Sequence, residues 1–243
     1  MQIINTILNF LFCNSCPMCG EIVEQTNNGL CKKCRQEVRV ISDTYCIKCG
    51  EPLLNRNEMY CERCHYRKHF YDRAVGVFEH DGVVRDSIYN YKFKNIRVNA
   101  RFYARQAYRV QQRFFERTLI EAIIPVPVHK SREQERGYNQ AAVFGRELSK
   151  ITGIPCYENI LTKTSKTKSQ KKLSENMRYS NLKKAFEVDK EKLSGMKTIL
   201  VVDDIYTTGS TVDACSYILK KSGVQKVYVM CISRGVDIYY NKK

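Results

Sequence analysis

Four Cys-x-x-Cys pairs divide the first quarter of the chain into equal steps. The pairs begin at positions 16, 31, 46 and 61, so each starts 15 residues after the one before it. Two adjacent pairs therefore have a spacing typical of tetrahedral zinc sites with four cysteine ligands. The eight cysteines concerned are Cys16, Cys19, Cys31, Cys34, Cys46, Cys49, Cys61 and Cys64. A segment this small buries little apolar surface, so bound metal is expected to supply its folding free energy.

The cysteine pattern also repeats with a period of 30 residues. Cys16-Pro-Met-Cys-Gly-Glu recurs as Cys46-Ile-Lys-Cys-Gly-Glu. This offset favours two tandem zinc ribbons, with one metal site in each repeat. The even spacing leaves open a cross-braced pairing or a central site made by the second and third pairs, and Cys13 and His65 are further candidate ligands. With all eight thiolates used, the sites would be structural rather than catalytic.

Length and hydropathy bound the class of protein. The 243 residues allow one α/β core with a small appendage, and we expect a boundary near residue 70, between a ribbon domain over 1–70 and a second domain over 71–243. The chain contains no run of about 18 apolar residues, so no membrane span is expected. Residues 1–12 are apolar without a basic stretch or cleavage site, so a short docked helix is expected there rather than a secretory signal. We therefore expect a cytoplasmic protein, which favours zinc over disulfides.

Residues 199–211, ILVVDDIYTTGST, carry the strongest chemical signal. Four hydrophobic residues suited to a buried parallel strand precede Asp203 and Asp204, and small hydroxyl residues around Gly209 follow, where a helix over 212–221 is expected to begin. A helix N-terminus favours an anionic phosphate, and open sheets bind ligands at the carboxyl ends of their strands. The stretch matches neither a Walker A loop nor a dinucleotide fingerprint. The alternative interpretation is a buried strand followed by an N-capped helix.

Other segments complete an alternating pattern of strands and helices. Residues 73–80 alternate like a strand, Asp81-Gly82 is a hairpin-type turn signal, and residues 83–93 have a helical pattern. Further strands are expected over 118–128, 185–188 and 226–233. This alternation predicts an α/β fold with a parallel sheet.

Basic residues are concentrated in one segment of a chain whose net charge is +16. Arginines recur at every fourth position over 97–117, which on a single helix would trace a slowly turning arginine-rich surface. Like charges four residues apart repel slightly, so the array does not stabilise the helix. A nucleic-acid backbone would explain it, and a solvated helix face in a basic protein is the alternative.

Two polar segments interrupt the pattern of strands and helices. The first, residues 129–140, follows the strand over 118–128 and would bring to the carboxyl end of that strand Lys130, Arg132, Arg136, Asn139 and Gln140. The second, residues 162–184, is lysine-rich and is interpreted as a lid or a linker. Its Lys168, Lys171 and Lys172 are candidates for contacts with substrate phosphates or with nucleic acid.

The order of these motifs resembles that of a known family. The stretch 199–211 resembles the signature of type I phosphoribosyltransferases, and nearly the whole chain resembles the ComF/GntX-like family, in which a double zinc ribbon comes first and a Pro-Val-Pro…Arg-Gly-Tyr-Asn-Gln segment follows, here within 125–140. The same pattern includes Thr167, Gln170, Leu173, Arg178 and Asn181. The resemblance implies a type I phosphoribosyltransferase-like parallel sheet flanked by helices, with a small N-terminal double zinc ribbon.

The resemblance also implies roles for individual residues. Asp203 and Asp204 would hold the ribose hydroxyls of phosphoribosyl pyrophosphate (PRPP), directly or through Mg²⁺, and Arg136 would stabilise the departing pyrophosphate. The 5′-phosphate would lie in a loop formed by Thr207, Thr208, Gly209, Ser210 and Thr211. The cofactors implied are two structural zinc ions, and Mg²⁺ together with PRPP.

As a whole, the resemblance implies a late competence protein that handles incoming single-stranded DNA together with a helicase-like ATPase of the uptake machinery. Such a protein would be cytoplasmic, or held at the inner face of the membrane by that machinery. Two hypotheses follow for the pocket. It is either the active site of a Mg²⁺-dependent phosphoribosyltransferase with an unidentified nucleotide-related acceptor, or a nucleotide or PRPP sensor within a DNA-handling protein.

Overall fold

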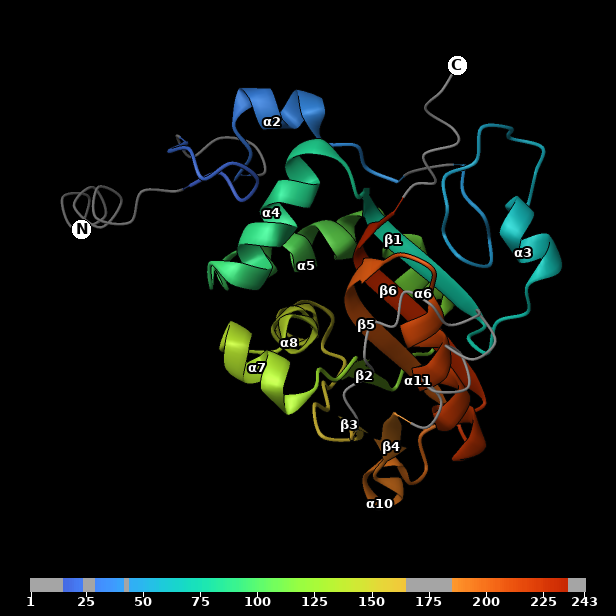
Figure 1. The fold of residues 1–243 in the computed structure, drawn as a ribbon. Helices are drawn as coiled ribbons and strands as arrows, with labels where there is room; N and C mark the ends of the chain where they lie inside the picture. The colour runs from blue at the N-terminus through green and yellow to red at the C-terminus, as the bar shows by residue number, and fades with distance from the viewer. Residues whose placement is uncertain (1–14, 24–28, 42–43, 165–184, 236–243) are drawn as a thin grey trace, which may run out of the picture.

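A four-stranded parallel sheet lies at the centre of the molecule (Figure 1), with the strand order β1-β6-β5-β2. The computed structural model describes residues 15–23, 29–41, 44–164 and 185–235. The strands of the sheet are β1 (Arg73–Glu79), β2 (Ala122–Pro125), β5 (Thr198–Tyr206) and β6 (Lys226–Arg234). The α/β fold with a parallel sheet that the sequence predicted is therefore confirmed.

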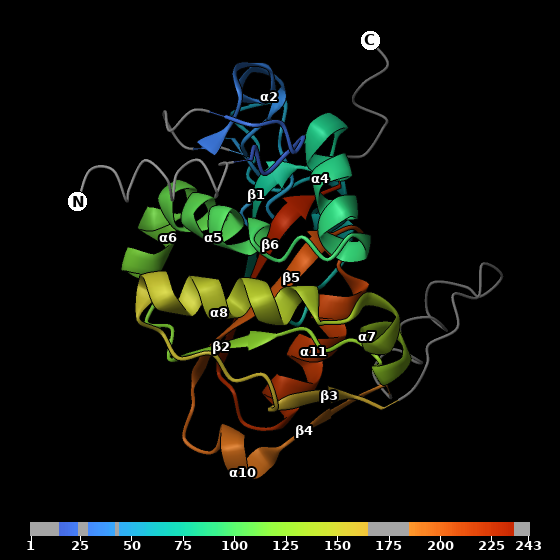
Figure 2. The ribbon, with the colours of Figure 1, turned by 90° about the vertical axis from the view of Figure 1, so that its left-hand side faces the viewer.

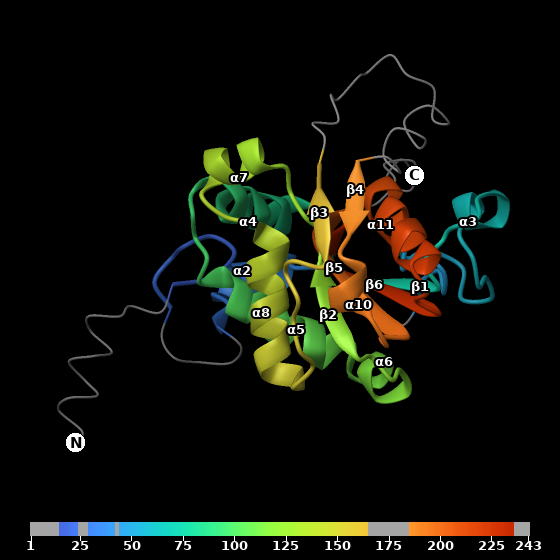
Figure 3. The same ribbon diagram turned by 90° about the horizontal axis from the view of Figure 1, so that it is seen from below.

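Helices cover both faces of this sheet. On one face lie α4 (Gly82–Phe93), α5 (Asn99–Val110) and α8 (Gln140–Thr152), and on the other lies α11 (Ser210–Lys221), as Figures 2 and 3 show. Alternate residues of β5 serve the two cores: Val201 packs on the α11 side and Val202 on the α8 side. Burial on both faces explains why the strand is a continuous apolar run.

A small antiparallel pair stands apart from the main sheet. It consists of β3 (Leu161–Lys163) and β4 (Phe186–Val188), and α10 (Lys190–Leu193) follows it. The β4 strand packs against α11. The lid or linker interpretation of residues 162–184, with its three lysines and with the motif residues between 167 and 181, lies mostly outside the described residues.

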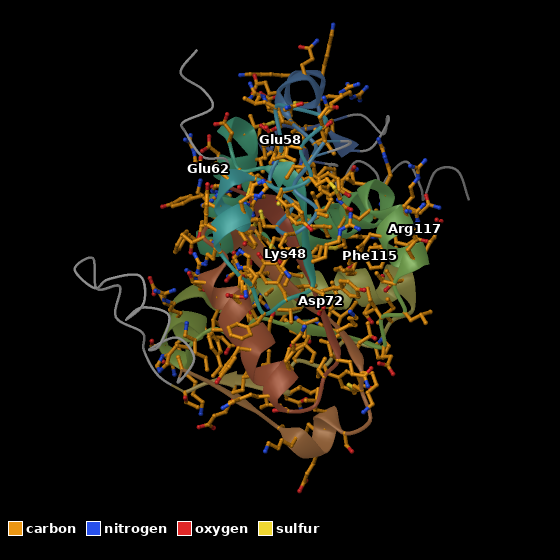
Figure 4. The ribbon with its side chains drawn as sticks, turned by 90° about the vertical axis from the view of Figure 1, so that its right-hand side faces the viewer. Lys48, Glu58, Glu62, Asp72, Phe115 and Arg117 are labelled. Atoms are coloured by element: carbon orange, nitrogen blue, oxygen red, sulfur yellow. The ribbon has the colours of Figure 1, made fainter. Side chains whose placement is uncertain are left out.

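The two ribbons lie beside the same sheet but on different faces of it. The first carries α2 (Lys32–Glu37), and its Cys16 and Cys34 join the core on the α4 and α5 side. The second carries α3 (Glu62–Tyr66), and three of its cysteines join the core on the α11 side. In Figure 4, Lys48 of the second ribbon lies beside Asp72, and Lys48 Nζ donates a hydrogen bond to the Asp72 carbonyl at 3.2 Å.

Three expectations from the sequence are corrected. The arginine-rich segment is not one helix: α5 ends at Val110 and α6 (Gln112–Arg117) begins after Gln111, whose buried side chain donates to the Gly76 carbonyl at 3.0 Å. Asp81 does not start a hairpin but caps α4, because β1 pairs in parallel with β6 and needs a crossover. The strand predicted over 118–128 shrinks to an edge strand, β2, that ends at Pro125.

The remaining local predictions agree with the structure or lie outside the described part of the chain. The predicted strand over 73–80 corresponds to β1, the one over 226–233 to β6, and the predicted helix over 212–221 to α11. The proposed helix over residues 1–12 and the candidate ligand Cys13 lie outside the described residues. No helix among the described residues is long and apolar enough to cross a membrane.

Candidate functional site

The eight paired cysteines form two separate tetrads. The first tetrad is Cys16, Cys19, Cys31 and Cys34, and the second is Cys46, Cys49, Cys61 and Cys64. Within each, the four sulfur atoms lie within 4.8 Å of one another. Tetrahedral Zn–S bonds of about 2.3 Å place ligand sulfurs about 3.8 Å apart. The observed separations of 3.7 Å for Cys19–Cys31 and 3.6 Å for Cys49–Cys61 match that geometry.

The two tetrads therefore fit two zinc ions, one in each ribbon. This arrangement is the tandem pairing that the 30-residue repeat favoured, and it excludes a central site made by the second and third pairs. The cysteines of the tetrads are all free of disulfide bonds. Four thiolates close each site, so the metal would have a structural role and hold the chain segments together.

The acid pair lies at the carboxyl end of the sheet, within β5 rather than after it. Asp203 is partly exposed and Asp204 is buried. Asp203 Oδ1 accepts a hydrogen bond from the Asp204 amide at 2.9 Å. Although Asp203 is only partly covered, the loss of water around its carboxyl group, together with the charge of Asp204, raises the pKa of Asp203 to about 7. A dication or a pair of hydroxyl donors would relieve this repulsion, so the pair has the chemistry to hold Mg²⁺ or a ribose diol.

A short loop joins the acid pair to α11. Gly209 has φ +75° and precedes Ser210, the first residue of the helix. Thr207 and Thr208 are exposed, and Thr208 Oγ1 lies 2.9 Å from Ser210 Oγ. Thr211 follows in the first turn of α11, which has 12 residues. The loop thus presents hydroxyl groups at the start of a helix, where free amides favour an anion.

Two lysines from other elements lie near enough to the acid pair to interact with its charge. Lys92, at the end of α4, places Nζ 3.1 Å from Asp204 Oδ1. Lys163, the last residue of β3, is partly buried, and its Nζ lies 5.2 Å from the centre of the Phe186 ring. Burial lowers the pKa of Lys163, as does the neighbouring Arg132, whereas the charge of Asp203 opposes the shift. These cations would face the phosphate groups of a ligand held by the acids. Sequence reasoning did not single out Lys92 or Lys163.

The polar segment after β2 folds into α7 (Lys130–Arg136) and the start of α8, and its side chains have different roles. Arg136 is half-buried, with Cζ 5.2 Å from the centre of the Phe93 ring and Nη1 3.1 Å from Gln140 Oε1. Asn139 caps α8 by accepting from the Ala141 amide at 3.0 Å. Asn139 and Gln140 therefore fix the local backbone. The role of Arg136 toward a leaving group stays a prediction.

A basic groove lies between α5 and α8, away from the acid pair. Its volume is about 500 Å³. The lining residues are Arg97, Val98, Arg101, Arg105, Glu147, Lys150 and Ile151. Arg97 precedes α5 and is fixed, because Nη2 donates to the Gly137 carbonyl at 2.9 Å. Among the described residues, no carboxylate lies within ion-pair distance of Arg101 or Arg105, so their charges face the groove.

Comparisons with known proteins match two separate stretches of the chain to two known domains. Residues 7–65 match a double zinc ribbon domain, and residues 139–237 match a phosphoribosyl transferase domain. Competence protein F of Haemophilus influenzae is 38% identical over 152 residues, which cover 61% of this chain and 66% of that protein. DNA utilization protein YhgH of Escherichia coli K12 is 34% identical over 116 residues, covering 48% of this chain and 50% of that protein.

The chain belongs to the ComF-like family. Another member, competence protein ComFC of Bacillus subtilis, is 31% identical over 101 residues, which cover 42% of this chain and 39% of that protein. The matches thus span between about two fifths and two thirds of the relatives' own lengths. Among solved structures, an adenine phosphoribosyltransferase aligns with a TM-score of 0.35 and 14% identity, covering 60% of this chain and 75% of that one.

Within this ComF-like chain, the sequence singled out the eight cysteines of the two tetrads and proposed the acid pair as site residues, but it did not single out the two lysines near the acids. Lys92 is one of many lysines in a basic chain, and its approach to Asp204 depends on how α4 packs. Lys163 lies within a predicted lysine-rich segment, where only its place at the end of a short strand distinguishes it. The division of the chain at residue 70 stays a prediction.

Proposed function

We propose that this ComF-like protein binds PRPP with Mg²⁺ at the carboxyl end of β5 and acts in the uptake of DNA during natural competence. The observation that carries the proposal is the juxtaposition of the acid pair, the hydroxyl-lined loop at 207–210 and Lys92, whose Nζ lies 3.1 Å from Asp204 Oδ1. The names of the relatives, competence protein F and DNA utilization protein YhgH, support the biological role.

The geometry suggests a division of labour within the pocket. Asp203 and Asp204 would accept hydrogen bonds from the ribose diol, while the loop amides and hydroxyls would hold the 5′-phosphate. Lys92 would exchange its contact with Asp204 for the ligand's phosphates, and Lys163, at the end of β3, would be a second cation for them. Bound Mg²⁺ would offset charge on the pyrophosphate. Preorganised cations of this kind stabilise a leaving pyrophosphate without a nucleophilic side chain.

Calorimetric titration with PRPP and Mg²⁺ tests the pocket. We expect Asp203→Asn and Asp204→Asn each to weaken binding by about tenfold or more, the cost of losing a charged hydrogen-bond acceptor. Glu187→Gln, on the exposed face of β4, is the control and should bind like the wild type. No heat from the wild-type protein, or equal affinity in all four proteins, would remove the basis of the proposal.

The raised pKa of Asp203 predicts a pH dependence of this binding. The carboxylate form, which accepts from the ribose and attracts Mg²⁺, becomes dominant only as the pH rises through about 7. Affinity for PRPP should therefore increase between pH 6 and pH 8, by up to about tenfold per unit below the pKa. Asp203→Asn should flatten this profile, whereas a slope that persists in the variant would assign the titration to another group.

The alternative for the same pocket is catalysis. The acid pair and the cations near it are groups that phosphoribosyl transfer would use, and the acceptor would be a nucleotide-related molecule. Pyrophosphate release from PRPP on addition of single-stranded DNA or cell extract would support turnover. Release that is equal with Asp204→Asn would show a contaminating activity instead.

A second function, handling of single-stranded DNA, is favoured by the groove between α5 and α8. Arg101 and Arg105 line it from α5, whereas Arg113 lies beyond the break at Gln111. Arg101→Ala with Arg105→Ala should weaken single-strand binding and reduce the slope of log K against log salt by about 1.4, for two lost phosphate contacts. Arg113→Ala is the matched control. An unchanged slope in the double variant, or an equal loss in the control, would exclude this groove.

A further inference from the structure

Arg234, the last residue of β6, lies between the second cysteine tetrad and the strand that carries the acid pair. The side chain is fully buried, at 1% exposure. Its Nη2 lies 3.2 Å from Cys49 Sγ and 3.0 Å from Glu51 Oε2. Its register partner on β5 is Tyr206, and the guanidinium carbon lies 4.2 Å from the centre of the Tyr206 ring. One side chain therefore contacts a metal ligand, an acid beside it, and β5.

Tyr206 continues this chain of contacts to the loop. Its hydroxyl lies 2.6 Å from the hydroxyl of Tyr71, which fixes the direction of the ring. The ring lies directly below Gly209, where an added Cβ would overlap the ring and hydroxyl of Tyr206. The loop backbone is therefore seated on the tyrosine, and a shift of the ring would move the loop.

The charges around Arg234 favour a single arrangement. A zinc ion held by four thiolates carries a net charge of about −2, which outer-shell cations offset. Among the described residues, Arg234 Nε and Nη1 have no hydrogen-bond partner. The buried guanidinium is thus held by the carboxylate, the sulfur and the aromatic face, all in one orientation. Loss of any of these would leave the cation free to turn.

We propose that Arg234 is a positioning residue through which the metal-loaded second ribbon holds Tyr206, and with it the loop at 207–209. This proposal rests on the proposed function only in the identity of the ligand that the loop would bind. It makes the second zinc site part of the support of the ligand pocket, although no tetrad cysteine belongs to the acid pair or the loop.

Amide hydrogen exchange tests the proposal without any ligand. In Arg234→Lys, the amides of residues 207–210 should exchange about tenfold faster than in the wild type, because the loop opens locally more often. Zinc content should stay at that of the wild-type protein. The control is Arg73→Lys on β1, another arginine that lies over aromatic rings and bonds a second-ribbon residue, Tyr45, at 2.7 Å. In Arg73→Lys, amide exchange at residues 207–210 should be the same as in the wild type.

Binding of PRPP with Mg²⁺ provides the second readout and separates the two proposals. Affinity should fall about tenfold in Arg234→Lys, in step with the loop exchange, and stay unchanged in Arg73→Lys. Absence of binding to the wild type would overturn the proposed function, while the exchange data would still decide the role of Arg234. Unchanged loop exchange in Arg234→Lys, or an equal increase in Arg73→Lys, would overturn the positioning role.

A second variant covers the case in which Arg234→Lys does not fold. Tyr206→Leu leaves Arg234, Glu51 and the tetrad in place but removes the ring below Gly209. Faster exchange at residues 207–210 with wild-type zinc content is the expected result. Wild-type exchange in that variant would show that the loop does not depend on the tyrosine, and the proposal would fail.

Discussion

The two halves of the cysteine repeat have the same local structure. In each, the amide of the first cysteine donates to the carbonyl of the glutamate five residues later at 2.7 Å: Cys16 to Glu21 and Cys46 to Glu51. The glycine before each glutamate is left-handed, with φ +83° at Gly20 and +74° at Gly50. The repeated sequence therefore encodes the same metal-binding turn twice.

The surroundings of these two turns differ completely. Glu21 is exposed, whereas Glu51 is 2% exposed and lies between two arginines, with Oε2 3.1 Å from Arg63 Nη2 and 3.0 Å from Arg234 Nη2. The first ribbon rests on α4 and α5, where Asn99 Nδ2 donates to the Pro17 carbonyl at 2.8 Å. The comparison teaches that local sequence determines the metal site, while tertiary contacts determine what that site supports.

Cysteine substitutions should separate the two ribbons most strongly. Cys49→Ser removes a buried ligand that also contacts Arg234, so we expect loss of one zinc ion, a large fall in the unfolding temperature and loss of PRPP binding. Cys19→Ser removes an exposed ligand at the far side of the sheet and should also cost one zinc ion. Its PRPP affinity, however, should remain within about twofold of the wild type, because distant sites act independently.

Metal analysis, calorimetry and thermal unfolding of the same samples check this contrast. Apparent folding free energies from structural zinc are about 10–16 kcal/mol in isolated ribbons, so the second ribbon is expected to unfold without its metal. Equal loss of PRPP affinity in the two variants would mean that the ribbons support the pocket alike. Zinc content well below two per chain in the wild type would contradict the tetrads themselves.

The glutamates of the repeat provide a milder test of the same contrast. Glu51→Gln leaves Arg234 and Arg63 without the carboxylate that they share, and breaking a buried ion pair typically costs about 3–5 kcal/mol of unfolding free energy. Glu21→Gln, at the equivalent exposed position, should change that free energy by less than about 0.5 kcal/mol. Urea unfolding followed by circular dichroism measures both. A comparable change at the two positions would place the two glutamates in equivalent roles.

Much of the fold followed from the sequence because its signals are local. The cysteine spacing gave the two tetrads, and the apolar run before Asp203 gave β5 and the helix after it. The break at Gln111 could not be predicted, since it depends on a hydrogen bond to Gly76, 35 residues away in the chain. Four-residue arginine spacing suits a helix on either side of that break, so the pattern carried no sign of it.

The residues of the candidate site also differ in whether local sequence or long-range packing determines them. The acids and the loop at 207–211 are contiguous in sequence, and their residue types indicate the chemistry proposed for them. Lys92 and Arg234 reach their partners only through the packing of α4 and the pairing of β6 with β5. Arg234 in particular is the last residue of an ordinary buried strand, and nothing near it in the sequence predicts contact with Cys49. The residues that hold a site in place are harder to predict than the residues of the site itself, because they come from distant segments of the chain.

Alanine at the two repeat glycines should give the smallest effects and still distinguish the ribbons. An alanine forced into the left-handed region costs about 1–2 kcal/mol of unfolding free energy, which Gly20→Ala should show, since an added Cβ there meets nothing within 4 Å. At Gly50 the Cβ would lie 2.9 Å from the Ala74 carbonyl oxygen and 3.1 Å from Val75 Cα. Backbone of β1 cannot yield easily, so Gly50→Ala should cost about 1–3 kcal/mol more. Equal costs in urea unfolding would mean that the second ribbon can move away from β1, and the close contact between ribbon and sheet would not contribute to stability.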